Sequence, residues 1–537
     1  MKMTIEKAVL FFLGLTFFIG TWHALPMLSV IGDEQCFVGS VLRAMERHTI
    51  VPAVDDVPYG TLTYVLNYLL MGVVLLFALP FFRFDVAGLK MFLLQSPEYA
   101  YIVPRFLNAC LAVGMLVLFH RFLTREVKDT KAKLFLLVLL FTNVITTLIL
   151  HTGKMWVLST LLVMISFRYV YDALEKGSGT TERPHRSIFL AIFFSFLALA
   201  NFPLNLYSLI SIPILFFFFR KKKDVCFSIG ISVLVGLLAF VLVTAFNFEG
   251  IKHQVLGIST DFHTIGVTSR FDLGAILRSF SSYALKLVYL FPLTLITLLM
   301  VWKNGIRNKI LFVLSLIYFF VNFTTIALVA NGAYISMMDK LRYLFHLGFF
   351  LTFLLASFNI SFKKKMYVIG GISLLYGLFT VYMLAVPTTY NRAYDWVKRE
   401  FADSDIVIVN KAVGPMLQLP KNKSSYLLIE KESCATKCLN TLKDDLHREF
   451  KPITIDEKSI KTIDVMDLAK GKDLYFILST ATSSQDMQQV AFFGNPIDDA
   501  RYYSVDFNIG NYFDMNYLRA RNLGHNIYIY KYTGPRD

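Results

Sequence analysis

Two adjacent carboxylates, Asp33 and Glu34, follow the first apolar segment of the chain. Phe37, Val41 and Leu42 recur after them at helical spacing, which predicts an amphipathic helix lying along a membrane surface. Carboxylate pairs are typical of general acid–base chemistry. A carboxylate at a helix N-terminus is also a good cap, so the residue types alone leave a catalytic and a structural role open.

Basic residues at the ends of predicted spans form the second group of candidates. Arg105 opens one apolar segment, Lys340 and Arg342 open another, and His346 follows Arg342 by one helical turn on the same face. Lys154 lies in a short polar turn between two apolar segments. Ionisable residues at membrane depth are functional candidates by default, and the alternative is that they extend to lipid headgroups.

The predicted external loops hold three further candidates. Asp55 and Asp56 form a second acidic pair in the first loop, which either joins Asp33 in a metal or acceptor site or lies in a solvated turn. Arg270 belongs to the second long loop, whose His and Asp spacing lacks a complete metal-ligand set. We therefore interpret that loop as a lid, and the identity of any bound metal stays open.

The composition indicates the kind of scaffold that carries these residues. Of 537 residues, 55% are hydrophobic and only 17% are charged, against roughly 25% charged in soluble domains. Apolar runs of about 20 residues, separated by basic clusters, are typical of a multi-pass α-helical membrane protein. This pattern excludes a soluble globular fold, a disordered chain and a nucleic-acid binder.

The distribution of charge supports the same interpretation. Residues 387–537 contain 20 basic and 20 acidic side chains, so the net charge of +15 belongs wholly to residues 1–386. A basic excess confined to the membrane part is a topology signal, because basic loops stay in the cytoplasm. It places the N-terminus in the cytoplasm and the C-terminus outside.

The hydrophobic pattern predicts 11 to 13 transmembrane helices within a membrane domain of residues 1–386, with interfacial helices in the first external loop, 32–61. The segment 62–102 either adds two of these spans or lies partly along the outer interface. The other predicted spans are 8–31, 103–121, 134–151, 156–173, 187–202, 204–219, 225–246, 281–301, 310–330, 341–358 and 366–386.

Residues 387–537 have a different character and predict an extracytoplasmic α/β domain. The expected helices are 391–402 and 436–450, and the expected strands are 405–410, 426–429, 473–479 and 526–532. This part has no Gly-rich phosphate loop, zinc-ligand spacing or nucleophile motif. We interpret it as an acceptor-binding or packing domain.

The order of these features resembles the GT-C glycosyltransferases. The acidic pair, the interfacial helix, the stretch Pro-Tyr-Gly-Thr-Leu at 58–62 and the arginine at 105 follow one another as in the branch with protein O-mannosyltransferases and lipid A aminoarabinose transferases. Asp339-Lys-Leu-Arg-Tyr343 looks like the late Arg-Tyr element of that superfamily. Many members have an acidic residue where Lys154-Met-Trp156 stands here, so a second catalytic carboxylate is not matched.

The resemblance implies a reaction. The donor would be a sugar on a polyprenyl phosphate, and the acceptor a hydroxyl of a lipid, glycan or protein outside the plasma membrane. Asp33 would act as general base for an inverting attack, and Glu34 would orient the acceptor or help to bind a divalent cation. Charge on the leaving phosphate would be stabilised by basic residues; the candidates are Arg105, Lys340, Arg342, Lys154 and His346.

Two other classes of function remain open at this point. A transporter or lipid flippase would show internal repeats with interrupted helices in matching halves, and Pro203 interrupts one apolar stretch without a visible counterpart. A membrane scaffold without catalysis would present the C-terminal part to protein partners.

Overall fold

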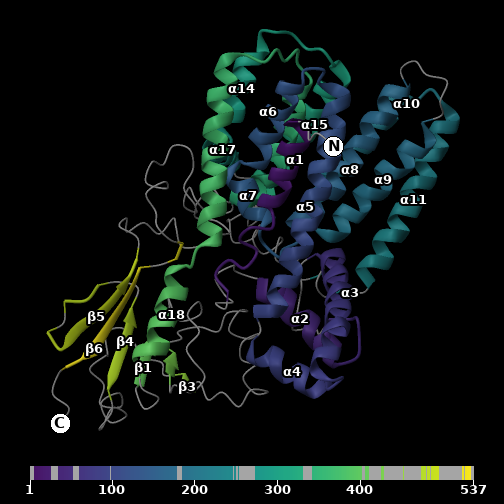
Figure 1. Ribbon diagram of the computed structural model, residues 1–537. Coiled ribbons are helices and arrows are strands. Elements are labelled where there is room, and N and C mark those ends of the chain that lie inside the picture. Colours follow the sequence, from purple (N-terminus) through teal and green to yellow (C-terminus); the bar gives the residue numbers. More distant parts are fainter. Residues whose placement is uncertain are drawn as a thin grey trace.

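The structure is a computed structural model of the 537-residue chain. It describes residues 5–25, 34–52, 60–96, 98–177, 184–245, 247–248, 252, 273–329, 341–401, 406–409, 425–427, 451–452, 473–478, 481–483, 485–494, 523–524 and 526–533. These residues form a helical bundle and a β-sheet, which are joined by one helix (Figure 1).

Long apolar helices make up most of the bundle, as the composition predicts. Within the described residues, six helices are long and apolar enough to cross a membrane. The six are α3 (Thr61–Ala78, extended by η1, Leu79–Phe82), α5 (Glu98–Glu126), α8 (Trp156–Gly177), α11 (Lys223–Ala245), α15 (Lys309–Val329) and α17 (Lys364–Ala385). The chain is therefore a membrane protein by the length and apolarity of its helices.

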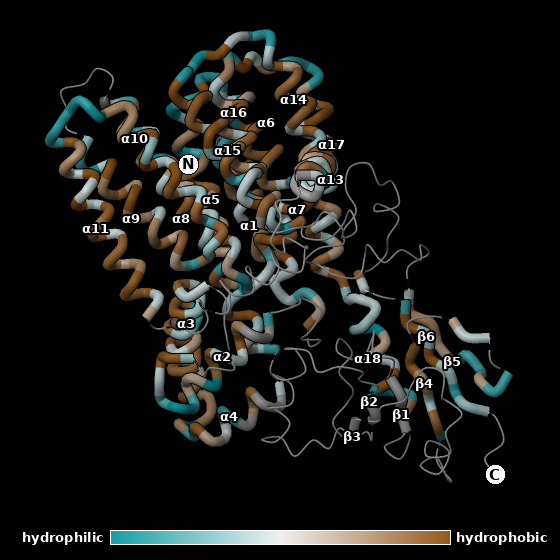
Figure 2. The backbone as a smooth tube through the Cα atoms, turned by 180° about the vertical axis from the view of Figure 1, so that it is seen from behind, coloured by the Kyte–Doolittle hydropathy of each residue, from teal (hydrophilic) through white to brown (hydrophobic). Residues whose placement is uncertain are grey.

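Two further pairs of consecutive apolar helices are sharply bent, and each pair is either a broken span or a re-entrant loop. α6 (Thr130–Phe141) meets α7 (Val144–Leu150) at 66°, and α13 (Leu273–Leu290) meets α14 (Pro292–Trp302) at 88°. Figure 2 views α13 end-on, so this helix crosses the direction of the long helices. The two bends meet, because the Asn143 side chain donates to the Leu290 carbonyl at 2.9 Å.

The described residues contain six to eight candidate spans, fewer than the 11 to 13 predicted. The difference lies partly in short apolar helices of 16 or 17 residues, below the roughly 20 that a bilayer requires. They are α9 (His185–Asn201), η2 (Pro203–Ser208) with α10 (Ser211–Phe219), and η3 (Leu341–Leu344) with α16 (Phe345–Ala356). The helix α1 (Ile5–Thr16) is also short, because turns replace it from residue 17 to residue 25.

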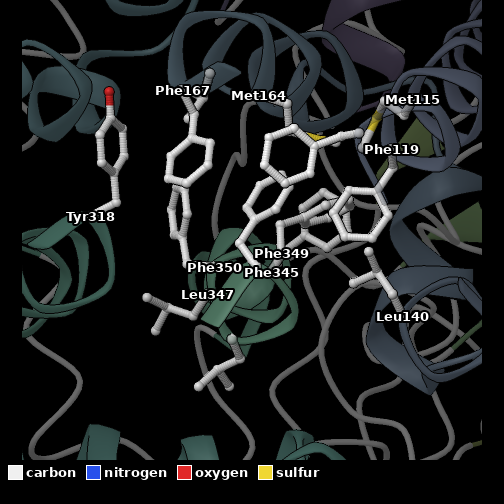
Figure 3. Close-up of a cluster of buried hydrophobic side chains, with 14 of the residues drawn as sticks. Met115, Phe119, Leu140, Met164, Phe167, Tyr318, Phe345, Leu347, Phe349 and Phe350 are labelled. Atoms are coloured by element: carbon white, nitrogen blue, oxygen red, sulfur yellow. The ribbon is translucent and has the colours of Figure 1, made fainter. Parts of the chain in front are cut away.

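The short helix α16 is the centre of the apolar core. All of its residues from Phe345 to Ala356 are buried, which is typical of a helix that is hydrophobic on every side. Phe353 stacks on Phe167 of α8 with ring centroids 4.4 Å apart, and Phe349 meets Phe119 of α5 edge-on at 6.2 Å. Figure 3 shows the surrounding aromatic and aliphatic side chains. A helix of this length can lie inside the bundle because protein rather than lipid surrounds it.

Two further helices, α2 (Glu34–Glu46) and α4 (Val86–Gln95), lie at one end of the bundle (Figure 1). The helix α2 packs against α3 and α5, and α4 packs against η1 and α5. They lie at the same end as the sheet in both views (Figures 1 and 2). The helix predicted after the acidic pair is thus confirmed, and its apolar Phe37, Val38 and Val41 are buried rather than spread on a surface.

The C-terminal strands form one six-stranded sheet in the order β3-β2-β1-β4-β6-β5. Its strands are β1 (Ile406–Val409), β2 (Ser425–Leu427), β3 (Lys451–Pro452), β4 (Leu474–Leu478), β5 (Met487–Phe493) and β6 (Ile527–Tyr532). The pairs from β3 to β4 are parallel, whereas β6 is antiparallel to both β4 and β5. The four predicted strands are confirmed, and the helix predicted at 436–450 lies outside the described residues.

The helix α18 (Thr389–Glu400) connects the two parts. It begins with a capping box in which the Thr388 hydroxyl accepts from the Asn391 backbone N–H. Its Tyr390, Ala393 and Val397 pack on the sheet in a core that also contains Ala24. The Asn391 amide donates to the Leu25 carbonyl at 2.8 Å. The turns that follow α1 are therefore held by the C-terminal part of the chain.

Candidate functional site

The predicted acidic pair leads to a buried ion pair. Glu34, the first residue of α2, accepts from Arg105 of α5 through both carboxylate oxygens. Arg105 Nη2 lies 2.6 Å from Glu34 Oε2, and Nε lies 2.9 Å from Oε1. This is the two-pronged geometry for which a planar guanidinium is suited. Neither side chain is exposed to solvent.

The remaining contacts of Arg105 are with backbone. Its Nη1 donates to the carbonyls of Thr21 at 3.0 Å and His23 at 2.7 Å. Together with the contacts to Glu34, these occupy four of the five guanidinium N–H groups. Burying two charges costs several kcal/mol per ion, and such a pair persists only where its geometry and additional hydrogen bonds are good.

A glycine completes the ion pair. The Gly153 backbone N–H donates to Glu34 Oε1 at 2.6 Å. A side chain at this position would place its Cβ 2.8 Å from that oxygen and 3.1 Å from Pro104, so only glycine fits without displacement. The Asn108 amide fixes the same turn by donating to the carbonyls of Thr152 at 2.5 Å and Lys154 at 2.8 Å.

We call these four segments, which converge on Glu34 and Arg105, the outer node, because the positive-inside rule predicts that they lie on the outer side of the membrane. They are the backbone at 21–23, the start of α2, the second turn of α5 and the turn at 151–155. Lys154 belongs to it and is 2% exposed, which is unusual for lysine. Glu34, Arg105 and Lys154 are predicted from the sequence as candidates, but no pairing among them can be predicted from it.

An aromatic cluster adjoins the outer node at Trp156, the first residue of α8. The Trp156 ring lies 5.5 Å from that of Tyr343 and 6.4 Å from that of His346, both measured between centroids. The Arg342 guanidinium lies over the Tyr343 ring at 5.2 Å. The predicted pair Arg342 and His346 is thus brought next to the turn that holds Lys154.

His346 is buried and makes a specific contact through one nitrogen. Its Nδ1 lies 2.6 Å from the hydroxyl of Tyr207 in η2. Its Nε2 is fully buried and has no hydrogen-bond partner among the described residues. Sequence analysis did not single out Tyr207, because one tyrosine among 27 carries no signal without the fold.

Lys286 is a second residue that sequence analysis missed. It is fully buried near the end of α13, and its Nζ lies 4.8 Å from the centroid of the Tyr283 ring. The helix α13 also packs against η3, which contains Arg342. A lysine within a predicted apolar span is a detectable signal, since such a charge is costly in a membrane.

Half of the predicted site residues are described. Glu34, Arg105, Lys154, Arg342 and His346 lie in the outer node or the aromatic cluster. Five others lie outside the described residues: Asp33, Asp55, Asp56, Arg270 and Lys340.

Two predicted roles do not fit the geometry. Arg105 is expected to contact a donor phosphate, but its N–H groups are directed at Glu34 and at two carbonyls. Glu34 is expected to orient the acceptor or to bind a cation, but both of its oxygens are already bound and it has no exposed surface. Both residues are positioning groups in this arrangement, which leaves Lys154, Lys286, Arg342 and His346 as the described candidates for an anionic ligand.

The arrangement has the parts that an anion-transferring site requires, apart from the base. Glu34 is held by Arg105 and the Gly153 N–H, and basic and aromatic side chains lie nearby, where low dielectric strengthens electrostatic interactions. The described residues contain no group of three or more His, Cys, Asp or Glu side chains that could hold a metal ion.

Comparisons with known proteins add no assignment. No protein-family model matches the sequence, and no curated protein matches it significantly.

Proposed function

We propose that the protein is a membrane glycosyltransferase of the GT-C type, which moves a sugar from a polyprenyl phosphate to a hydroxyl on the outer side of the plasma membrane. The observation that carries the proposal is the outer node. It fixes Glu34, the residue that directly follows Asp33 in the chain, by one ion pair and one hydrogen bond from a backbone N–H. A general base must be held within a fraction of an ångström, and in this proposal the fixed position of Glu34 serves to constrain the adjacent base.

In the proposed reaction Asp33 takes the proton of the acceptor hydroxyl. The hydroxyl oxygen then bonds to the anomeric carbon from the face opposite the phosphate, and the bond between that carbon and the phosphate oxygen breaks. The electron pair stays on the polyprenyl phosphate, and the sugar configuration inverts. Charge therefore grows on phosphate oxygens, where basic groups stabilise it.

The described basic side chains support this assignment of roles. Lys154 and Lys286 are buried cations, and Arg342 lies over the Tyr343 ring. Cations in a buried, low-dielectric position interact strongly with an anion that binds beside them. A lipid-linked phosphate is such an anion, and the apolar bundle offers a medium for its polyprenyl tail.

The orientation of the chain in the membrane and the role of the C-terminal domain complete the proposal. The positive-inside rule places the N-terminus in the cytoplasm, so the outer node and the C-terminal sheet face the opposite side. The acceptor is a lipid, glycan or protein, and the C-terminal domain binds or positions it. A divalent cation, if the reaction uses one, needs ligands other than Glu34.

A turnover assay tests the proposal. The full-length protein in liposomes is supplied with a panel of radiolabelled polyprenyl-phosphate sugars and with lipid, glycan and peptide acceptors. We expect release of polyprenyl phosphate from one donor and transfer of its label. Folded protein that neither binds nor consumes any of these donors would contradict the proposal.

A transporter or lipid flippase is the second candidate function. The two bent helix pairs favour it, because their bends meet at Asn143 and Leu290 and broken helices often form transport sites. It predicts movement of a lipid-linked substrate across the liposome membrane with its sugar–phosphate bond intact. The same assay distinguishes the two functions by whether free polyprenyl phosphate appears.

A further inference from the structure

We infer that Tyr207 is a positioning residue, which fixes the proton of His346 on Nε2 so that this nitrogen donates a hydrogen bond to the phosphate of the lipid donor. The inference rests on the proposed function and adds to it a residue with a defined role. Its starting point is the contact of 2.6 Å between the Tyr207 hydroxyl and His346 Nδ1.

The direction of that hydrogen bond follows from the surroundings of the phenol. The described residues offer the Tyr207 hydroxyl no hydrogen-bond acceptor other than His346. If Nδ1 carried the proton and donated it, the phenolic proton would have no acceptor in a fully buried position. The hydroxyl therefore donates to Nδ1, and the neutral imidazole carries its proton on Nε2.

The Nε2–H group is then a donor that needs an acceptor. It is buried and has no partner among the described residues. Buried donors in folded proteins are nearly always satisfied, so this one requires a partner beyond the described residues, and we assign that role to the bound lipid donor. The molecule must offer an acceptor, and a phosphate oxygen is an acceptor that carries charge.

The neighbours of His346 suit a phosphate rather than a neutral ligand. Arg342 lies one helical turn earlier, and its guanidinium covers the Tyr343 ring. The Trp156 ring lies 6.4 Å from the His346 ring and 5.5 Å from the Tyr343 ring, and such low-dielectric surroundings strengthen a charge-assisted hydrogen bond. A fixed N–H donor beside a guanidinium offers a phosphate two charge-assisted hydrogen bonds.

A pair of substitutions at His346 separates the role of each nitrogen. In glutamine the amide nitrogen reaches the place of Nε2, whereas in asparagine it reaches only the place of Nδ1. We expect the His346→Gln variant to bind farnesyl phosphate within about threefold of the wild-type protein. The His346→Asn variant loses the donor and should bind about 10- to 100-fold more weakly, as is typical for a hydrogen bond to a charged group.

A tyrosine substitution tests the positioning role. Tyr207→Phe keeps the ring and removes the donor to Nδ1, so farnesyl phosphate should bind about tenfold more weakly. In the His346→Gln background the same change should have no further effect, because no imidazole proton remains to be fixed. Tyr382→Phe, on the exposed face of α17, is the matched control.

Nitrogen spectra of ¹⁵N-histidine-labelled protein give a readout that does not depend on the ligand. The signal that His346→Gln removes should show a proton on Nε2 in the wild-type protein and a mixture of tautomers in Tyr207→Phe. Equal binding by the glutamine and asparagine variants, or a proton on Nδ1, would overturn the inference. Failure of the folded wild-type protein to bind farnesyl phosphate would instead contradict the proposed function.

Discussion

The helix α5 carries one arginine near each end, and the groups of side chains around these two arginines are built differently. Arg105 and Arg125 are twenty residues apart, which is about 30 Å along a helix and close to the apolar thickness of a bilayer. Arg105 is fully buried with a single carboxylate, whereas Arg125 is 39% exposed and contacts Glu126, Asp172 and Glu175. We call the second group the inner cluster.

The inner cluster has alternatives for each of its contacts. Glu126 also accepts from the Tyr171 hydroxyl at 2.9 Å and from the Asn308 amide at 3.0 Å. Water and several partners can therefore replace a lost contact. In the outer node Arg105 and Glu34 are each other's only charged partner among the described residues, and neither side chain is exposed. The comparison indicates that the inner cluster holds helix ends together, while the outer node fixes one geometry.

The largest expected effect follows from breaking the outer node. Arg105→Met would leave the Glu34 carboxylate buried without its countercharge, and removal of one member of a buried pair typically costs about 3–5 kcal/mol. We expect a loss of this size in the free energy of unfolding, measured by detergent-induced denaturation. A loss below about 1 kcal/mol would show that the node tolerates change as the inner cluster does.

The second effect concerns the glycine of the node. Gly153→Ala would push a methyl group against Glu34 Oε1 and Pro104, and overpacking of this kind typically costs about 1–3 kcal/mol. Gly114 in α5 is the matched control, because a Cβ there meets nothing within 4 Å. Gly114→Ala should leave the unfolding free energy unchanged or raise it slightly. Equal losses from both substitutions would contradict the close fit at Gly153.

The third effect should be smaller and should depend on salt. Arg125→Gln removes partly exposed ion pairs, and exposed pairs typically contribute about 0.2–1 kcal/mol. The difference from the wild-type protein should shrink as the salt concentration rises, because ions screen exposed charges. The effect of Arg105→Met on the free energy of unfolding should not change with salt. The two salt titrations therefore distinguish the buried ion pair from the exposed ones.

The smallest effect concerns Glu6, which precedes the apolar part of α1. Hydrogen bonds from Lys133 and His120 lower the pKa of this carboxyl below its usual value. A carboxyl with a lowered pKa in the folded state adds stability at neutral pH, and this stability is lost as the pH falls through that pKa. Glu6→Gln should therefore flatten the acid side of the curve of thermal midpoint against pH. Identical curves would show that Glu6 adds no stability.

The sequence predicts much of the scaffold, since hydrophobic length and alternation decide it locally. The apolar runs that became α5, α8, α11, α15 and α17 are predicted, as are the four strands that match β1, β2, β4 and β6. The described residues contain fewer candidate spans than the 11 to 13 predicted, and the hydropathy pattern of α16 does not reveal that protein surrounds it. A buried short helix and a membrane span have the same hydropathy.

The candidate site is predicted by residue type but not by pairing. Glu34 and Arg105 are 71 positions apart, and only the fold brings them together. Their contact changes the predicted roles, because an arginine bound to a carboxylate and two carbonyls has little capacity left for a phosphate. Tyr207 is invisible in the sequence, since its role depends on the neighbouring ring of His346.

The most direct test of the account compares donor binding and turnover in Asp33→Asn. The account predicts that this variant binds the polyprenyl-phosphate sugar as the wild-type protein does, and that it transfers the sugar about 10²- to 10⁴-fold more slowly, as is typical for loss of a general base. Asp224→Asn, at an exposed position at the start of α11, should transfer at the wild-type rate. Full transfer activity in Asp33→Asn would contradict the account.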